Sequence, residues 1–133
     1  MSLRKSYHSV YSLNYHLILV TKYRQKVITD DICEYLKELF IKIADNHGVS
    51  MVEFNHDVDH IHILFSASPT TSLSKFINSF KSASSRKVKT QFPETKTKLW
   101  EEMFWSRSYY LSTCGELSMD SVQRYIQNQG EKH

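Results

Sequence analysis

The chain has 133 residues and a formal net charge of +3, with 41% hydrophobic and 23% charged residues. These values are typical of one globular domain, so we expect a single domain over residues 1–133 and exclude a disordered, collagenous or coiled-coil chain. Three glycines and two prolines leave no linker or low-complexity segment. No apolar run approaches the roughly 18 residues of a membrane helix. Two distant cysteines and the lack of a signal-peptide pattern predict a cytoplasmic protein.

The charges are unevenly distributed along the chain. Residues 1–26 contain five basic residues and no acidic one, and residues 60–98 contain seven basic residues and one acidic one. Between them, residues 27–59 contain two basic and eight acidic residues. Two basic blocks separated by an acidic block indicate a positive surface on part of the fold. From charge alone, nucleic-acid binding and a set of solvated helix faces both remain open.

The first half of the chain predicts a strand, a helix and two further strands. Residues 12–28 are rich in β-branched and aromatic residues and lack glycine and proline, which predicts a long strand. N-capping residues at 29–31 precede apolar residues at helical spacing, and Gly48 ends this helix. The two short strands and the turn between them are expected at 49–54, 60–66 and 55–57.

The second half predicts two helices around a strand. The first of them begins near Thr71 or Ser72, and its buried stripe consists of Leu73, Phe76, Ile77 and Phe80. A polar loop follows at 91–98, and the aromatic segment 103–113 is strand or hairpin material that Gly115 ends. Ser118 caps the last helix.

The predicted element order is β-α-β-β-α-β-α. Its first six elements match the split βαβ pattern of ferredoxin-like folds, which include RRM-like domains. We therefore expect an α+β fold with an antiparallel sheet and two helices on one face. The last helix is an addition, and its apolar stripe of Met119, Val122 and Ile126 must dock against the rest of the molecule.

Two histidines alternate with an isoleucine in the predicted strand at 60–66. Because successive strand side chains point to opposite faces, His60 and His62 share one face and Ile61 lies on the other. The apolar face is expected against the helices, and the two imidazoles, about 6.5–7 Å apart at Cα, can converge on one metal ion. A metal or phosphate site and two exposed histidines without a ligand both remain open. Asp57 and Asp59 precede the histidine pair. They either accept hydrogen bonds from imidazole N–H groups or serve only as residues of the turn.

Tyr125 and Gln129 are four residues apart in the last predicted helix and therefore lie on one stripe of it. A helical tyrosine is most often a packing residue, but a tyrosine hydroxyl is also a known covalent nucleophile. The amide of Gln129 offers an oxygen that can complete the ligand shell of a metal ion. The two strand histidines and this Tyr-x-x-x-Gln pair together form a more specific pattern than either part alone.

Five sequence blocks carry a resemblance to a known family. They read TKYR at 21–24, DHIHIL at 59–64, LSKF at 73–76, WSRSYYLST at 105–113 and YIQNQ at 125–129. In this order they resemble the motifs of the single-tyrosine HUH transposases of the insertion sequence 200/605 group, where U is a bulky apolar residue. A His-x-His alone would be weak, but the resemblance covers most of the chain.

The resemblance implies a specific chemistry. Tyr125 would attack a DNA phosphate and form a 5′-phosphotyrosine link, releasing a 3′-OH. His60, His62 and Gln129 would hold a divalent metal, Mg²⁺ or Mn²⁺, that polarises the scissile phosphate. The enzyme would be a homodimer in which the C-terminal helix is exchanged between subunits, and its substrate would be single-stranded DNA with hairpins near the element ends.

Basic side chains are the candidates for the DNA-binding surface. The stretch from Lys75 to Lys89 is the candidate for part of the hairpin surface that the resemblance implies. Arg24 and Arg107 are phosphate clamps or partners in surface ion pairs. The full predicted set is Lys22, Arg24, Lys75, Lys81, Arg86, Lys87, Lys89 and Arg107.

Other functions and one further ligand remain as alternatives. A domesticated repeat-associated tyrosine nuclease would use the same residues, whereas a non-catalytic ferredoxin-like nucleic-acid-binding module would need neither Tyr125 nor Gln129. An HxH phosphohydrolase would need a second acid–base set, for which the sequence gives no convincing candidate. His56 has the same alternation parity as His60 and would compete as a ligand if the strand began early. No general base is evident for Tyr125, since a free tyrosine has a pKa of about 10.

Overall fold

The structure, a computed structural model, describes residues 4–5, 10–11, 13–99, 103–113 and 119–129. Its strands are β1 (Arg4–Lys5), β2 (Val10–Tyr11), β3 (Asn14–Val20), β4 (Val49–His56), β5 (His60–Ala67) and β6 (Tyr110–Thr113). Its helices are α1 (Asp30–Asp45), α2 (Leu73–Gln91) and α3 (Met119–Gln129), with two 3-10 helices, η1 (Lys22–Arg24) and η2 (Pro93–Lys98). β1 and β2 form a small antiparallel pair that the sequence did not predict.

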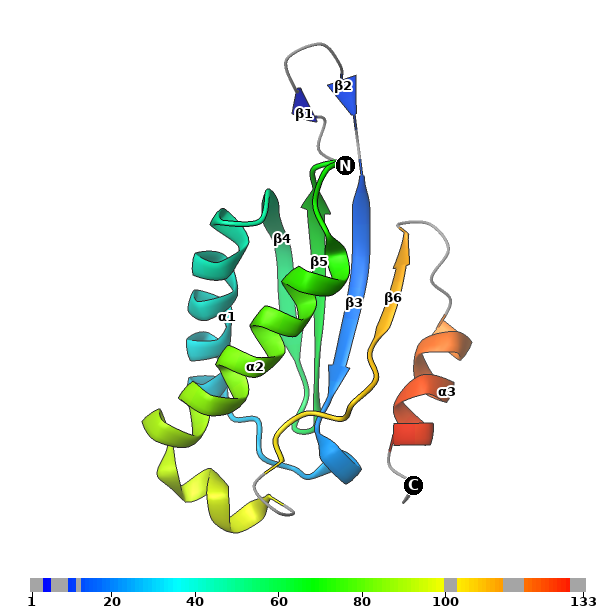
Figure 1. Ribbon diagram of the computed structural model, residues 1–133. Coiled ribbons are helices and arrows are strands. Elements are labelled where there is room, and N and C mark those ends of the chain that lie inside the picture. The colour runs from blue at the N-terminus through cyan, green and yellow to red at the C-terminus, as the bar shows by residue number, and fades with distance from the viewer. Residues whose placement is uncertain (1–3, 6–9, 12, 100–102, 114–118, 130–133) are drawn as a thin grey trace.

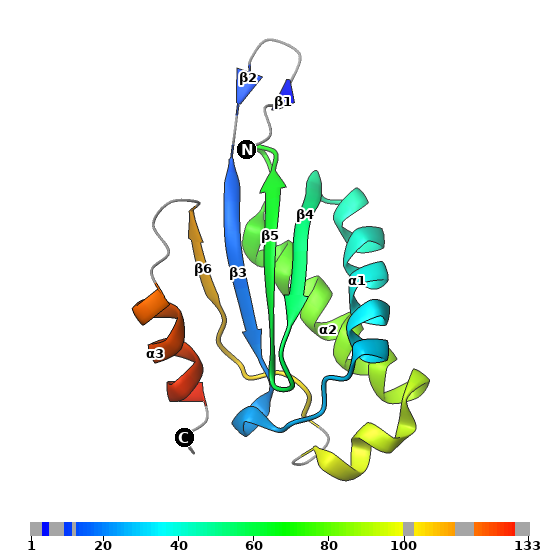
Figure 2. The same ribbon diagram turned by 180° about the vertical axis from the view of Figure 1, so that it is seen from behind.

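The main sheet has four antiparallel strands in the order β4-β5-β3-β6. Figures 1 and 2 show α1 and α2 on one face of this sheet, while α3 lies beside β6. From β3 onward the elements follow the order β-α-β-β-α-β, which with this strand order is the ferredoxin-like arrangement. The predicted α+β class, with two helices on one face and an added C-terminal helix, is confirmed.

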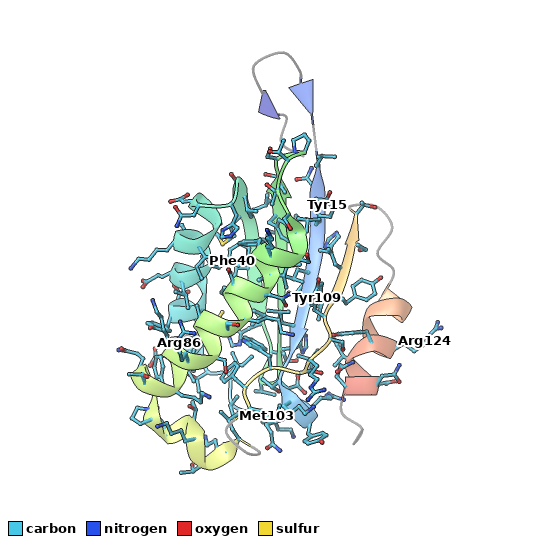
Figure 3. The ribbon with its side chains drawn as sticks, in the orientation of Figure 1. Tyr15, Phe40, Arg86, Met103, Tyr109 and Arg124 are labelled. Carbon is cyan, nitrogen blue, oxygen red and sulfur yellow. The ribbon has the colours of Figure 1, made fainter. Side chains whose placement is uncertain are left out.

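The hydrophobic core lies between the sheet and the two helices. Alternate residues of β3 and β5, such as Leu17 and Ile63, are fully buried there. Phe40 of α1 (labelled in Figure 3) lies with its ring centroid 5.2 Å from that of Phe76 and 5.2 Å from that of Phe80, both on α2. Burial of these aromatic side chains stabilises the folded state by roughly 25 cal/mol for each Å² of apolar surface removed from water. This core occupies one face of the sheet. The other face carries polar side chains together with Ile18 and Val20, which are also fully buried.

The first predicted helix begins after the capping residue Thr29 and ends shortly before Gly48, as the sequence predicts. The side-chain oxygen of Thr29 accepts a hydrogen bond from the N–H of Ile32 at 3.2 Å, so Thr29 is the N-cap of α1. Gly48 follows the helix with φ of +68°, a conformation that favours glycine. A Cβ atom at this position would lie 3.0 Å from the hydroxyl of Thr71, so the glycine also permits a close approach of the next loop.

The first strand is shorter than predicted and ends at Val20 rather than at residue 28. The chain turns through η1, where Tyr23 and Arg24 have φ of 53° and 54°. Neither residue type favours this left-handed conformation, so propensity gave no signal for the turn. The buried residues Val27 and Ile28 then pack into the core from a loop, which explains their apolar character.

Three other boundaries differ from the prediction. β4 continues to His56, so the turn lies at 57–59. The segment at 91–98 contains η2 instead of an irregular loop. In the aromatic segment only Tyr110–Thr113 forms a strand, although Trp105 makes an isolated bridge with Thr21. The predicted roles of Gly115 and Ser118, and the side chains of Met119 and Val122, lie outside the described residues. No helix in the described part of the chain is long and apolar enough to span a membrane.

Candidate active site on the open face of the sheet

The open face of the sheet, which lies opposite α1 and α2, carries the histidine pair. Ile61 is fully buried on the helix side of β5. His60 and His62 flank it in the strand and therefore point to the open face, where both are partly exposed. This is the arrangement that the alternation of the sequence predicts.

The register of the sheet defines two rows of residues on the open face, because directly opposite residues of paired strands point to the same side. The first row contains His62 of β5, Ile18 of β3 and Tyr110 of β6, and Asn55 of β4 lies opposite His62 on its other side. The second row contains His60 of β5 and Val20 of β3. The two histidines therefore lie in two adjacent rows of this face.

Asp59 orients the imidazole of His60. Its Oδ1 atom lies 2.9 Å from Nδ1 of His60, and its Oδ2 atom accepts a hydrogen bond of 2.9 Å from Nε of Arg24. An ionised carboxylate only accepts, so Nδ1 of His60 carries the proton. In a neutral imidazole with its proton on Nδ1, the lone pair is on Nε2, and this is the form in which a histidine binds a metal ion through Nε2.

The charge state of Asp59 is fixed by these two partners. Burial of this side chain would raise its pKa, but the hydrogen bonds from His60 and Arg24, together with the charge of Arg24, outweigh burial and lower the pKa below 3.8. Asp59 is therefore ionised at neutral pH. Asp57 has a different role, because its carboxylate accepts a hydrogen bond from the N–H of Val58 in the turn.

His62 contacts a third histidine that the sequence analysis did not single out. Nδ1 of His16 lies 2.9 Å from Nε2 of His62, and the two rings stack with centroids 5.1 Å apart. Burial is the main cause that lowers the pKa of His62, and the neighbouring His16 lowers it further. The imidazole of His62 is therefore neutral at neutral pH. The sequence offered one indication for His16. It precedes the buried Leu17 in the first strand, so its side chain points to the face away from the core.

Tyr125 and Gln129 of α3 dock onto the extended segment that precedes β6. The hydroxyl of Tyr125 lies 3.4 Å from the hydroxyl of Ser108, and its ring centroid is 5.6 Å from that of Tyr110. The hydroxyl of Ser106 donates a hydrogen bond to Oε1 of Gln129. Since Tyr110 belongs to the first row, Tyr125 lies over the same face as His62.

The same segment also places Gln129 near the second row, because Ser106 contacts both Gln129 and Val20. The N–H of Ser106 donates to the carbonyl of Val20 at 2.8 Å, and Val20 is directly opposite His60. The structure thus brings the four residues predicted to carry chemistry, His60, His62, Tyr125 and Gln129, to one face of the molecule.

Tyr125 is protonated in this environment. Burial raises the pKa of its phenol above 10, and the hydrogen bond with Ser108 opposes part of that effect. A phenol in this state would need activation to act as a nucleophile.

The donor set on the open face fits a divalent metal ion. The candidate donors are the imidazoles of His60 and His62, the second of which contacts His16, and the amide oxygen of Gln129. Oxygen donors suit Mg²⁺, and imidazoles bind Mn²⁺ more readily. Among the described residues, no three His, Cys, Asp or Glu side chains form a metal cluster, so the third protein ligand would be the amide.

Five of the predicted DNA-binding residues line two grooves beside α2. Lys75 and Arg86 line a groove of about 750 Å³ between α1 and α2. Lys81, Lys89 and Arg107 line a groove of about 660 Å³ between α2 and residues 103–107. Figure 3 shows Arg86 on α2. Lys87 is exposed farther along the same helix.

Three of the basic candidates make contacts that place them close to the candidate site or its supporting segment. Nζ of Lys81 donates hydrogen bonds of 2.8 Å and 2.7 Å to the carbonyls of Ser106 and Arg107, and burial lowers its pKa. Lys22 lies over the ring of Tyr23, 5.0 Å from its centroid. Arg24 is the partner of Asp59 described above. Lys81 therefore stabilises the segment that contacts Gln129, and Arg24 stabilises the carboxylate that contacts His60.

His56 lies away from the predicted ligands. It is directly opposite Ile61, which is buried on the helix side, and its Nε2 atom lies 2.9 Å from Oδ1 of Asp30 in α1. Because the strand parity that seemed to unite His56 with His60 is interrupted by the turn at 57–59, the two side chains point to opposite faces.

Comparison with known sequences identifies the family. A family model described as "Transposase IS200 like" matches residues 9–129. The chain therefore belongs to the IS200-like transposase family, which implies an enzyme that transposes DNA.

Two curated relatives have this activity in their names. ISDra2 transposase TnpA of Deinococcus radiodurans is 33% identical over 132 residues, covering 99% of this chain and 94% of that protein. The transposase for insertion sequence element IS200 of Salmonella typhimurium is 30% identical over 125 residues, covering 94% of this chain and 82% of that protein.

Two solved structures share the fold. A crystal structure at 1.90 Å of a candidate transposase from Deinococcus radiodurans has a TM-score of 0.87 and 34% identity, covering 97% of this chain and 99% of that chain. A REP-associated tyrosine transposase bound to a REP hairpin has a TM-score of 0.51 and 12% identity, covering 95% of this chain and 68% of that chain. The second similarity concerns the fold alone.

Proposed function

We propose that this transposase cleaves and rejoins single-stranded DNA at insertion-sequence ends through a covalent 5′-phosphotyrosine intermediate on Tyr125. The observation that carries the proposal is that α3 presents Tyr125 and Gln129 to the face on which His60 and His62 lie. The relatives that are at least 30% identical are named as insertion-sequence transposases, which supports this function over processing of chromosomal repeats.

In the proposed step, the phenolic oxygen of Tyr125 attacks the phosphorus of a phosphodiester, and the bond from phosphorus to the 3′ oxygen breaks. The phenol loses its proton and the departing 3′ oxygen gains one, so the products are a 5′-phosphotyrosine and a free 3′-OH. The tyrosyl link conserves the phosphodiester bond energy, so a second 3′-OH can rejoin the DNA without ATP.

We propose that His60, His62 and Gln129 hold a divalent metal, Mg²⁺ or Mn²⁺, beside the scissile phosphate. A bound divalent ion supplies Lewis-acid polarisation of the phosphate. The protein prepares this site through its own contacts. Asp59 keeps the proton of His60 on Nδ1. The hydroxyl of Ser106 donates a hydrogen bond to Oε1 of Gln129 and so orients this amide.

The proposed DNA partner is a hairpin with a single-stranded flank, and the two grooves beside α2 are its candidate binding surface. Their basic residues, which include Lys75, Arg86, Lys89 and Arg107, provide the positive charge that phosphates require. The REP-associated transposase, which has the same fold, is bound to a hairpin in its own structure. We further propose a homodimer in which α3 is exchanged between subunits.

The test uses the full chain and labelled single-stranded hairpin DNA from the flanks of its gene. We expect a covalent protein–DNA band on a denaturing gel that requires Mg²⁺ or Mn²⁺ and disappears with a chelator. Tyr125→Phe removes only the nucleophilic oxygen, so it should abolish the band and leave hairpin binding nearly unchanged. Tyr35→Phe is the matched control, because Tyr35 packs against Phe92 away from the open face. A covalent band of normal intensity with Tyr125→Phe would refute the assignment.

A further inference from the structure

The extended segment at 105–108 is anchored independently of α3. The indole N–H of Trp105 donates to the hydroxyl of Ser84 at 2.8 Å in the core. The N–H of Ser106 donates to the carbonyl of Val20, as described above. Nζ of Lys81 binds the carbonyls of Ser106 and of the next residue. Contacts to β3 and to α2 therefore fix the position of this segment relative to the sheet.

Two serines of this segment meet the two functional residues of α3. Ser106 binds Gln129 and Ser108 lies beside Tyr125. Two residues of extended chain span about 6.6 Å, and four residues of α-helix span about 6 Å. A pair of serines at i and i+2 therefore matches a pair of helical residues at i and i+4. A shift of α3 by one residue along its axis would break both contacts.

We propose that Ser106 and Ser108 are positioning residues that set the register in which α3 presents Gln129 and Tyr125 to the histidine pair. This inference rests on the proposed function. Ser106 binds β3 through its backbone N–H and α3 through its side-chain hydroxyl. Since Val20 is directly opposite His60, the hydroxyl of Ser106 connects the position of Gln129 to the second row of the open face.

Ser108 has a further effect on the nucleophile. Its hydroxyl is the polar group nearest to the phenol for which the structure gives a contact, and the hydrogen bond lowers the pKa of Tyr125 against the larger effect of burial. A hydroxyl that donates to the phenolic oxygen stabilises the phenolate more than the phenol. Ser108 thus favours the reactive form of Tyr125, a role for which the sequence offered no candidate.

The test compares Ser106→Ala, Ser108→Ala and the double variant with Ser112→Ala as the matched control. Ser112 lies in β6, and its buried hydroxyl has no hydrogen-bond partner among the described residues. The pKa of Tyr125 is measured by NMR on ring-labelled tyrosine, with its resonance assigned by its loss in Tyr125→Phe. Because the hydrogen bond with Ser108 lowers the pKa of Tyr125, we expect Ser108→Ala to raise this pKa and Ser112→Ala to leave it unchanged.

Metal and cleavage measurements test the register. Ser106→Ala should weaken Mn²⁺ binding, measured by electron paramagnetic resonance, by about tenfold. The double variant should lower kcat for cleavage of hairpin DNA by roughly tenfold or more and leave KM and hairpin affinity unchanged. Ser108→Thr, which keeps the hydroxyl, should restore the Tyr125 pKa.

The outcomes separate this inference from the proposed function. An unchanged Tyr125 pKa in Ser108→Ala, together with normal Mn²⁺ affinity and normal kcat in the double variant, would overturn the inference even if the wild type forms its adduct. Absence of an adduct in the wild type would instead refute the proposed function, while the Tyr125 pKa and the Mn²⁺ affinity would still report on the docking of α3. Thermal unfolding of each variant verifies that it is folded.

Discussion

At the scale of single residues, Asp59 connects the turn before β5 to the chemistry of the site. It is buried and ionised, it receives a hydrogen bond from Arg24, and it holds the proton of His60 on Nδ1. Arg24 reaches it from η1, where the chain adopts the left-handed conformation. The unusual backbone of η1 therefore has a function, because it places a guanidinium beside the carboxylate that orients a proposed ligand.

Asp59→Asn is predicted to weaken divalent metal binding by about 10–100-fold, because the neutral amide no longer enforces the tautomer of His60. Mn²⁺ titration followed by electron paramagnetic resonance measures this effect. Asp57→Asn is the control, since the carboxylate of Asp57 accepts a hydrogen bond from the backbone N–H of Val58 in the turn. Equal Mn²⁺ affinities for the two variants would show that Asp59 does not orient His60 for metal binding.

The same substitution should also change the pH dependence of stability. The pKa of Asp59 is lower in the folded state than the ordinary value of 3.8, so the ionised carboxylate stabilises the fold. That stabilisation is complete above pH 3.8 and is lost as the pH falls through the lowered folded-state pKa. Thermal unfolding of the wild type and Asp59→Asn should differ at neutral pH and converge in acid.

Some residues of the site were accessible to sequence reasoning and others were not. Strand alternation was sufficient to place His60 and His62 on one face, because that property is local to one strand. His16 contacts His62 only through the pairing of β3 with β5, and Ser106 meets Gln129 only after α3 docks. Such contacts depend on registers between distant segments, which one sequence does not determine.

At the scale of elements, α2 separates two grooves that carry basic side chains. The groove toward α1 contains Lys75 and Arg86, and the groove toward residues 103–107 contains Lys81 and Lys89. The ammonium group of Lys81 also donates hydrogen bonds to two backbone carbonyls. Among these groove residues, Lys81 therefore also anchors the neighbouring segment.

Reversing the charge of Lys75, Arg86 and Lys89 together is predicted to weaken hairpin binding and to flatten its salt dependence. Each lost phosphate contact should reduce the slope of log K against log[salt] by about 0.9 for duplex DNA or about 0.7 for single strands. Reversal of Lys96 and Lys98, which are exposed in η2, provides the control. A slope that stays the same in the α2 variant would place the DNA surface elsewhere.

The elements of the fold were largely predictable because their signals are local. Thr29 caps α1, and the spacing of Phe76 and Phe80 marks the buried face of α2. The end of the first strand was wrong because Tyr23 and Arg24 turn the chain without glycine or proline. In the aromatic segment, the bonds of residues 105–107 go to Val20, Ser84 and Lys81 instead of forming a continuous strand ladder.

At the scale of the whole molecule, the C-terminal helix is the part whose position decides the assembly of the site. α3 lies beside β6, away from the core under α1 and α2, and Figure 3 shows its Arg124 projecting outward. α3 contacts the segment at 106–110 and the 3-10 helix η1. Neither contact involves the core under α1 and α2, which is compatible with exchange of α3 between two copies without unfolding of the ferredoxin-like part.

The proposed exchange predicts complementation between two inactive variants. When His60→Ala and Tyr125→Phe chains are mixed and reassorted, helix exchange gives each mixed dimer one intact site and one site with both defects. Random reassortment makes about half of the dimers mixed, so roughly a quarter of the wild-type single-strand cleavage should return. No recovery, with subunit exchange verified by mass spectrometry, would mean that each site uses the helix of its own chain.

The central claim, that Tyr125 is the residue that becomes linked to DNA, is tested most directly by locating the link. Cleavage by trypsin after Arg124 and Lys132 gives a peptide, residues 125–132, in which Tyr125 is the only tyrosine. After reaction with single-stranded hairpin DNA and nuclease trimming, mass spectrometry should find a 5′-linked nucleotide on Tyr125 in this peptide. A nucleotide on another peptide, such as the one with Tyr109 and Tyr110, or on a serine, would contradict the account.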